Sequence, residues 1–217
     1  MKGEPMKVKL VNVSKRIHGS PVLQNVSYEF DDSTIYGLTG SNGSGKTMLI
    51  RAIAGLLIPT SGEVIINGDV LHQKADFPER MGITIGNIVF PKDLTGFQNL
   101  VALSKINKVA TIEQIKNAFK KVGLNEEDWN IKVSDYSLGM RQKLSIAQAI
   151  FEKPKLLLLD EPTNGLDEES TWILRNTLKE IAQAGSTVIL ASHDKEDIAY
   201  LSDEVIQIDG GKIVNIK

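Results

Sequence analysis

The segment Gly40–Thr47 reads Gly-Ser-Asn-Gly-Ser-Gly-Lys-Thr, and its residue types and spacing suit it to hold a chain of phosphates. It matches the pattern G-x-x-x-x-G-K-S/T at every fixed position. Glycines let successive backbone N–H groups turn toward phosphate oxygens, Lys46 adds a cation, and the Thr47 hydroxyl can ligate Mg²⁺. We therefore expect a nucleoside triphosphate and Mg²⁺ here. The residues expected to contact the triphosphate are Ser41, Asn42, Gly43, Ser44, Gly45, Lys46, Thr47 and Met48.

The residues on either side of this loop supply the setting that it needs. An apolar run, Ile35–Leu38, precedes the loop, and an apolar helical pattern, Met48–Ala54, follows it and ends at Gly55. The first turn of a helix presents free N–H groups and a partial positive charge, both of which attract phosphate. The sequence thus predicts a strand, the loop and a helix in that order.

A pair of carboxylates, Asp160 and Glu161, follows the apolar run Leu156–Leu159. In an open α/β sheet, ligands bind at the carboxyl ends of the strands. Asp160 can hold Mg²⁺ through water, and Glu161 can polarise a water molecule for attack on a phosphate. Taken alone, such a pair is more often a solvated strand end. The phosphate loop upstream favours the catalytic interpretation.

The composition is that of an ordinary globular protein. The 217 residues, 41% of them hydrophobic, suit one large domain or two small lobes. Twenty-five basic and 27 acidic residues give a net charge of -2, so we expect no nucleic-acid partner. The absence of cysteine excludes disulfides and thiolate metal sites. No apolar run approaches ~20 residues and the N-terminus lacks a secretory signal, so we expect a cytosolic chain that reaches a membrane through a protein partner.

Three further β segments are predicted in the first third of the chain. Lys7–Val13 and Val26–Phe30 alternate apolar and polar residues, as half-buried strands do. Glu63–Ile66 is followed by Asn67-Gly68, the dipeptide best suited to a tight hairpin turn. This part of the chain therefore predicts an antiparallel edge.

The pattern changes to helical between Thr95 and Ile150. Apolar residues recur three or four positions apart from Ile112 to Val122, and Gly123 is a stop signal. Beyond this region, two short apolar runs, 155–160 and 187–192, are typical of strands covered on both faces in a parallel sheet. We expect a crossover helix over Thr171–Ala184 to join them.

Further segments resemble one family over essentially the whole chain, the nucleotide-binding subunits of ATP-binding-cassette transporters. Tyr136–Gln142, Tyr-Ser-Leu-Gly-Met-Arg-Gln, looks like the family signature, usually Leu-Ser-Gly-Gly-Gln. Asn164–Asp167 looks like the D-loop, and His193 looks like the switch histidine. Leu94–Gly96, with Asn99-Leu100 after it, is similar to the start of the helical lobe in many exporters.

The resemblance implies an α/β P-loop NTPase with a β-rich nucleotide-binding lobe and a helical signature lobe. Residues 1–217 would form one cassette, with 1–90 and 151–217 as the catalytic lobe and 91–150 as the helical lobe. Two cassettes, as a homodimer or a heterodimer, would close head to tail on two ATP molecules. A separate transmembrane subunit would hold them at the cytoplasmic face of the membrane.

The resemblance also assigns roles to individual residues. Glu161, His193 and Lys46 would be catalytic, with His193 sensing the γ-phosphate and helping to orient water. Ser137 and Gly139 would contact the nucleotide of the opposite cassette. ATP hydrolysis would power export of a drug-like amphiphile or an antimicrobial peptide.

Several residues keep a second interpretation. Ser137 is a good N-cap, and Leu138–Phe151 after it could be a core helix with no ligand. Asp167 can cap the crossover helix as well as contact a second cassette. His193 alone would more often be an ordinary strand-end histidine. His18, near the position where the family stacks an aromatic residue on adenine, is equally interpreted as an exposed loop residue.

The chain departs from the family pattern at two further places. Leu138 and Met140 occupy signature positions where Gly and Gln are commoner, which we interpret as a subfamily character of drug and peptide exporters. Ile83–Ile88, where a metal-binding Gln or Glu is expected, contains neither. Asn87 could offer an amide oxygen to Mg²⁺, although Gly86 can also be aligned at that position.

A cassette ATPase without a membrane partner is the alternative function. A chromosome-maintenance head would need long coiled-coil segments, and a translation factor of the cassette type usually has two cassettes and a basic surface. Neither feature is visible in this sequence. The residues Lys46, Asp160, Glu161 and His193 also argue against a nucleotide-binding module that does not hydrolyse.

Overall fold

A parallel sheet forms the centre of the computed structural model, which describes residues 6–86 and 88–217. Its strands in spatial order are β10 (Lys212–Ile216), β9 (Glu204–Asp209), β3 (Ile35–Thr39), β8 (Thr187–Ala191), β7 (Leu156–Asp160) and β6 (Met81–Thr84). Neighbouring strands from β9 to β6 run parallel, and β10 returns antiparallel to β9. The predicted buried strands at 155–160 and 187–192 are thus confirmed.

A second, antiparallel sheet covers one side of this layer. Its strands in spatial order are β2 (Ser20–Phe30), β1 (Val8–Ile17), β4 (Ser61–Ile66) and β5 (Asp69–Val70). Asn67 and Gly68 join β4 to β5 with φ angles of 52° and 88°, as a tight hairpin turn requires. The antiparallel edge predicted from the sequence is confirmed.

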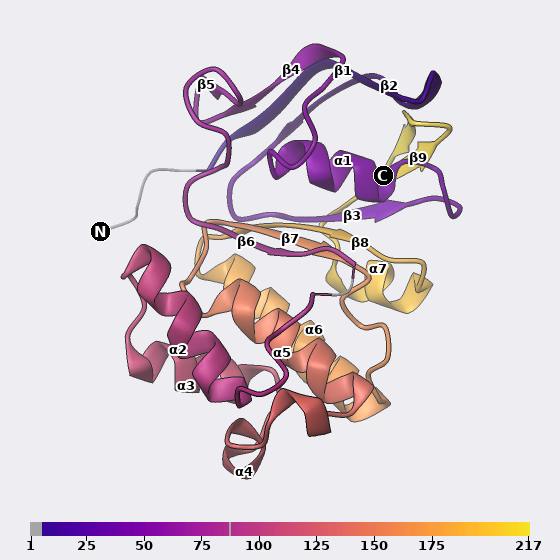
Figure 1. The fold of residues 1–217 in the computed structure, drawn as a ribbon. Helices are drawn as coiled ribbons and strands as arrows, with labels where there is room; N and C mark the ends of the chain where they lie inside the picture. The colour runs from indigo at the N-terminus through magenta and orange to yellow at the C-terminus, as the bar shows by residue number, and fades with distance from the viewer. Residues whose placement is uncertain (1–5, 87) are drawn as a thin grey trace.

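The helices occupy two layers (Figure 1). Helix α1 (Lys46–Ile53) lies between the two sheets, and the other helices lie mainly below the central sheet in the view of Figure 1. These are α2 (Gly96–Asn107), α3 (Ile112–Lys121), α4 (Glu126–Trp129), a 3₁₀ turn (Val133–Asp135), α5 (Leu138–Ile150), α6 (Glu168–Gln183) and α7 (Lys195–Leu201). The central sheet is therefore covered on both faces, which explains why its strands are continuously apolar.

Alternate side chains of the central strands belong to two different apolar cores. Leu156 and Leu158 of β7 pack with α1 and the antiparallel sheet. Leu157 and Leu159 of the same strand pack with α3, α5 and α6. All four leucines are fully buried, so a shift of β7 by one residue would exchange the two sets and place Asp160 on the wrong face.

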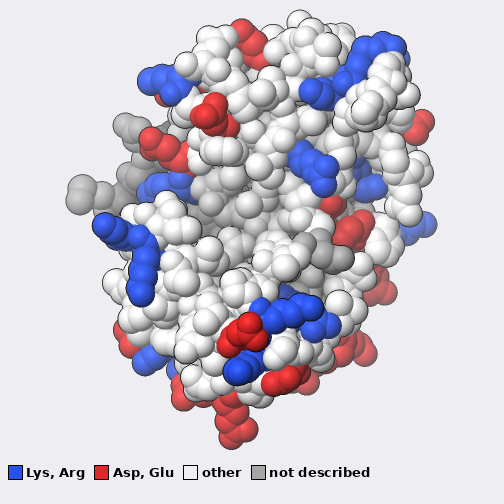
Figure 2. Space-filling model, in the orientation of Figure 1, with Lys and Arg blue, Asp and Glu red and all other residues white. Residues whose placement is uncertain are grey.

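Charged side chains of both signs are spread over the surface. Lys and Arg lie among Asp and Glu on the face drawn in Figure 2. Lys9 and Glu29 form one of the exposed ion pairs of the structure, with 3.5 Å between Nζ and Oε2. Because each such pair contributes at most ~1 kcal/mol, the fold depends on the apolar layers and not on surface charge.

Several elements differ from the sequence prediction. Strand β2 begins at Ser20 and not at Val26, and helix α1 begins at Lys46 and not at Met48. The crossover helix α6 begins at Glu168, three residues before its predicted start. Strands β6, β9 and β10 and helix α7 were not predicted. Helices α2 to α5 fall within 91–150, and the division into two lobes stays a prediction.

Candidate functional site

The phosphate loop lies between β3 and α1, in the setting that the sequence predicts. Three of its glycines have positive φ angles, which are 146° at Gly40, 78° at Gly43 and 115° at Gly45. Gly45 is the N-cap of α1, and a Cβ there would come within 3.0 Å of the Val22 carbonyl oxygen. The loop can therefore present backbone N–H groups to an anion at the start of a buried helix.

Lys46 is held inside this loop. Its Nζ donates hydrogen bonds to the carbonyl oxygens of Gly40, at 2.7 Å, and Ser41, at 3.1 Å. The residue is only 6% exposed. None of the ion pairs found within the described residues involves Lys46, so its charge is not neutralised by a carboxylate there. This arrangement presents a desolvated cation to the position where phosphates would lie.

Thr47 and Asp160, both predicted to face Mg²⁺, are in direct contact. The Thr47 hydroxyl donates a hydrogen bond of 2.8 Å to Oδ2 of Asp160. Burial raises the pKa of the Asp160 carboxyl above its usual range, and the negative charge of Glu161 adds to this. The hydrogen bond from Thr47 and the cation of Lys46 act in the opposite direction. A divalent cation beside Asp160 would favour the ionised carboxylate.

These two oxygen donors fit Mg²⁺, which usually takes one or two protein ligands and completes its shell with phosphates and water. Within residues 6–86 and 88–217, no group of three His, Cys, Asp or Glu side chains could hold a metal on its own. A metal at this site would thus depend on the bound nucleotide for further ligands. Asn87, the other predicted metal ligand, lies outside the described residues.

Glu161 and His193 form a close pair at the carboxyl edge of the central sheet. Oε2 of Glu161 lies 2.6 Å from Nδ1 of His193 and also accepts the His193 backbone N–H at 3.2 Å. Glu161 directly follows β7, and His193 lies two residues after the end of β8, where Asp160 pairs with Ala191. An ionised carboxylate can only accept, so in that state Nδ1 carries the hydrogen and Nε2 is left to contact a ligand.

The backbone of Glu161 is itself unusual. Its φ angle is +51°, which is uncommon for a residue other than glycine, and its N–H donates to the Ala191 carbonyl oxygen at 2.8 Å. Such strained conformations are found preferentially at functional sites, where the surrounding structure maintains them. The turn therefore fixes the direction of the Glu161 side chain instead of leaving it free in solvent.

The predicted signature segment begins helix α5. The Ser137 hydroxyl accepts a hydrogen bond from the Met140 backbone N–H at 3.1 Å, so the N-cap interpretation is confirmed. A Cβ on Gly139 would lie 3.2 Å from the carbonyl oxygen of Gly165, which places the start of α5 beside the predicted D-loop. Gln142 reaches the same region and donates to the Pro162 carbonyl oxygen at 2.9 Å. Contact with a second cassette stays a prediction.

Two other predicted residues have simple local structures. Asp167 is the N-cap of α6 and accepts the Ser170 backbone N–H at 2.7 Å, and hydrogen bonds from Ser170 lower the pKa of its carboxyl. His18 is exposed at the turn between β1 and β2, with a φ angle of 46°. Stacking of His18 on adenine and contact of Asp167 with a second cassette both stay predictions.

Asp197, which the sequence did not predict as a site residue, has a buried carboxylate that accepts hydrogen bonds from Thr163, Arg175 and Ser192. It lies on α7, a seven-residue helix that Asp194 caps. A signal was present, because Asp194 followed by acidic residues and then Ile198 and Leu201 is typical of a short helix start.

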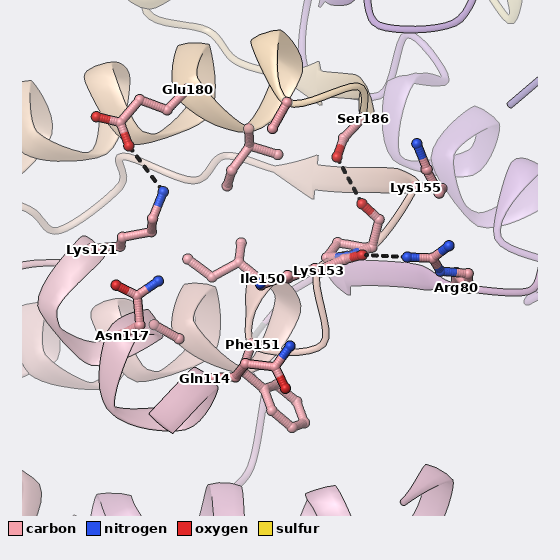
Figure 3. A pocket seen from close by; sticks show the side chains of 14 residues that line it. Arg80, Gln114, Asn117, Lys121, Ile150, Phe151, Lys153, Lys155, Glu180 and Ser186 are labelled. Atoms are coloured by element: carbon pink, nitrogen blue, oxygen red, sulfur yellow. Dashed lines mark hydrogen bonds and ion pairs between the residues drawn. The ribbon is translucent and has the colours of Figure 1, made fainter. Parts of the chain in front are cut away.

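A cavity of about 520 Å³, drawn in Figure 3, is lined by none of these site residues. It lies by the amino-terminal ends of β7 and β8, so it is at the opposite edge of the sheet from Glu161 and His193. Lys121 and Glu180 pair there at 2.9 Å, and Lys155 donates to the Gly185 carbonyl oxygen. A cavity of about 480 Å³ borders Gly40 and His193 directly.

Comparison with known proteins identifies the class. A family model described as ABC transporter matches residues 23–164. The chain therefore belongs to the ABC transporter family, as the resemblance of its motifs indicated. It is an ATP-binding cassette of the P-loop NTPase fold that hydrolyses ATP and energises transport.

Relatives and solved structures match nearly the whole chain. It is 46% identical to the uncharacterized ABC transporter ATP-binding protein YybJ of Bacillus subtilis, over 95% of this chain and 94% of the relative. For YdbJ of the same organism the identity is 42%, over 93% of this chain and 66% of the relative. The dimeric ATP-binding cassette MJ0796, in a post-hydrolysis state with ADP and Pi, superposes with a TM-score of 0.87 at 25% identity over 97% of both chains.

Substitution of the phosphate-loop lysine tests the nucleotide site. Lys46→Ala should weaken ATP binding by about 100-fold, because the loop loses the cation aimed at the phosphates. Titration with a fluorescent ATP analogue measures this. Lys9→Ala, which removes an exposed lysine from β1, is the control and should bind ATP as the wild type does. Equal ATP affinities of the wild type, Lys46→Ala and Lys9→Ala would contradict the role of Lys46.

Asp160→Asn should raise the melting temperature of the nucleotide-free chain while reducing Mg²⁺-dependent turnover by at least ~10-fold. Because burial raises the pKa of Asp160, its ionised form is less favourable in the folded chain than in the unfolded one, so stability is lost as pH rises through that pKa. The gain in melting temperature should therefore be present at pH 7. It should disappear below about pH 4, where the Asp160 carboxyl of the wild type is protonated in both the folded and the unfolded chain. Calorimetry across this range measures it; a gain that grows toward low pH would contradict the argument.

Proposed function

We propose that this chain is the ATPase subunit of an exporter for a drug-like amphiphile or an antimicrobial peptide, acting on a separate transmembrane subunit at the cytoplasmic face of the membrane. The observation that carries the proposal is an apolar groove next to α2 and α5, at which such a subunit can dock. Among the described residues, no helix is long and apolar enough to cross a bilayer.

The groove has a volume of about 410 Å³ and is formed by the segment after β6 together with α2 and α5. Its lining residues are Ile88, Val89, Phe90, Pro91, Leu94, Asn99, Ala102, Leu103, Ile106 and Gln148. Val89 is 84% exposed and Ile106 is 74% exposed. Exposed apolar side chains gathered around a groove are typical of a protein interaction site.

The position of the groove connects it to the nucleotide. The lining residues Ile88–Pro91 come after β6 in the sequence, and β6 pairs with β7 from Met81↔Leu156 to Thr84↔Leu159. Asp160 is the next residue of β7, so a shift of the edge strand β6 would also move this candidate metal ligand. A partner in the groove would thus be coupled to ATP binding through one pair of strands.

The preferred cargo rests on relatives whose transport roles are named. The bacitracin transport ATP-binding protein BcrA of Enterococcus faecalis is 33% identical over 94% of this chain. The linearmycin resistance protein LnrL of Bacillus subtilis and the lantibiotic transport protein SrtF of Streptococcus pyogenes are each 32% identical. The names of these relatives refer to bacitracin, linearmycin and a lantibiotic, and the similarity supports a drug-like amphiphile or an antimicrobial peptide as the cargo here.

The proposed mechanism assigns one task to each group of residues. The loop N–H groups and Lys46 bind the phosphates, and Thr47 with Asp160 would hold Mg²⁺, whose charge offsets that of the phosphates. Glu161 accepts a proton from the attacking water. His193 donates from Nε2 to the γ-phosphate in its doubly protonated form, in which Nδ1–H is held by Glu161.

We propose that a second cassette completes the site, because Ser137 and Gly139 begin a helix that no described hydrogen bond joins to the phosphate loop. The free N–H groups at the start of α5 suit a phosphate of the opposite cassette. ATP would thereby link two chains, and hydrolysis would release them. Either a homodimer or a heterodimer satisfies this geometry, and no nucleic acid is required.

Removal of the proposed base separates binding from hydrolysis. Glu161→Gln should bind ATP normally, lose at least ~100-fold in turnover and accumulate as an ATP-bound dimer, because the amide cannot accept the proton. Phosphate release and light scattering measure the two effects. Glu113→Gln, at an exposed position of α3, is the control with the same chemical change. Undiminished hydrolysis by Glu161→Gln would show that another group is the base.

Val89→Asp tests whether a membrane subunit docks in the apolar groove. Desolvating a carboxylate in the apolar groove is unfavourable, so most of the Val89→Asp chain should be absent from washed membranes. The purified variant should still bind ATP. Val214→Asp, at a valine of β10 that is 54% exposed, is the matched control. Quantitative blotting of the membrane fraction measures the difference.

Mass spectrometry of the complex purified with the wild-type chain in mild detergent completes this test. A multi-span protein that is lost with Val89→Asp supports the proposal, and stimulation of the ATPase of the reconstituted complex by amphiphilic peptides supports export. An active chain that copurifies with no multi-span protein would favour the alternative, a cassette ATPase without a membrane partner.

A further inference from the structure

A fully buried carboxylate lies beneath the Glu161–His193 pair. Asp197, on the first turn of α7, is 0% exposed. Its Oδ1 accepts from Nε of Arg175 at 2.7 Å and lies 2.7 Å from Nη2 of the same side chain. Its Oδ2 accepts from the hydroxyls of Thr163, at 2.5 Å, and Ser192, at 3.2 Å. The charge of Asp197 is thus matched by a cation and two hydroxyl donors.

The donors come from the segments that carry the proposed reactive groups. Thr163 lies two residues after Glu161, and Ser192 immediately precedes His193. Arg175 comes from α6, the helix that Asp167 caps. One carboxylate therefore joins the turn after β7, the end of β8 and the helix that follows the D-loop. Glu161 and His193, which are 2.6 Å apart, therefore each lie within two positions of a residue whose hydroxyl is bonded to Asp197.

We propose that Asp197 is a positioning residue, which holds Glu161 and His193 in register for hydrolysis; the inference rests on the catalytic roles proposed above for that pair. Asp197 acts only through its neighbours, because it is buried and bonded to three other side chains. His193 is exposed, so its ring is positioned by its own backbone and by the contact of Nδ1 with Glu161. Loss of the Asp197 contacts would release both segments and misplace the pair while leaving the phosphate loop intact.

Two neighbouring acids on α7 provide a matched pair of substitutions. Asp197→Asn removes the buried charge and directs an amide NH₂ group toward groups that themselves donate. Glu196→Gln removes an equal charge one residue earlier, from a side chain that is 84% exposed and 3.8 Å from Nη2 of the same arginine. The two variants differ in whether the network is broken, not in net charge.

Steady-state ATPase measurements separate positioning from binding. Asp197→Asn should lower kcat by about tenfold or more, with a KM for ATP close to that of the wild type. Glu196→Gln should keep kcat within about twofold. A folded Asp197→Asn variant with wild-type kcat would overturn the proposal, as would equal losses in both variants.

Thr163 offers a second pair if Asp197→Asn fails to fold. Thr163→Val removes the hydroxyl but keeps the shape, whereas Thr163→Ser keeps the hydroxyl. We expect kcat to fall in the first and to be largely retained in the second, with melting temperatures checked for both. A purely structural network predicts a fall in melting temperature with kcat retained in the folded fraction, and that result would overturn the proposal.

A spectroscopic measurement distinguishes this inference from the proposed function. The chain has three histidines, so the ring ¹⁵N signals of His193 can be assigned by substitution. The Nδ1 signal, which reports the hydrogen bond to Glu161, should move in Asp197→Asn and Thr163→Val but not in Glu196→Gln. If the signal moves but Glu161→Gln hydrolyses ATP normally, the base assignment fails and the network stands. If it does not move, the positioning role is refuted.

Discussion

The site depends first on the register of three parallel strands, β3, β8 and β7. Ala191, the last residue of β8, pairs with Leu38 on one side and with Asp160 on the other. The three strands therefore end together, and the residues that follow them are the phosphate loop, His193 and Glu161. No single element contains the candidate site; strand pairing brings its parts to one edge, as in other open α/β sheets.

Burial on both faces is what fixes this register. Because the side chains of β7 and β8 alternate between two cores, a slip of one residue would move every apolar side chain into the other core and every site residue with it. The apolar layers thus do more than stabilise the fold. They set the relative positions of Thr47 and Asp160, which come from elements 113 residues apart and meet at 2.8 Å.

Local signals explain which parts could be predicted from the sequence. The phosphate loop, the buried strands and helix α5 each have a motif, a continuous apolar run or a capped helical pattern, so a short window suffices. Strand β9 was missed because its six residues include charged and polar side chains and form no continuous apolar run, and α7 because seven residues give little periodicity. The contacts of Asp197 could not be predicted, since two of its three partners lie 22 and 34 residues away and only packing brings them together.

The geometry of the site is organised for a ligand, and this organisation costs free energy. Lys46 is bonded to two carbonyl oxygens of its own loop, and Asp160 is buried beside Thr47 with a raised pKa. Two opposite charges are thus withdrawn from water without being paired to one another. ATP with a divalent cation would relieve both, because phosphates neutralise the lysine and the metal favours the carboxylate. Preorganisation of this kind limits the rearrangement needed on binding, and it makes the stability of the chain depend on its ligand.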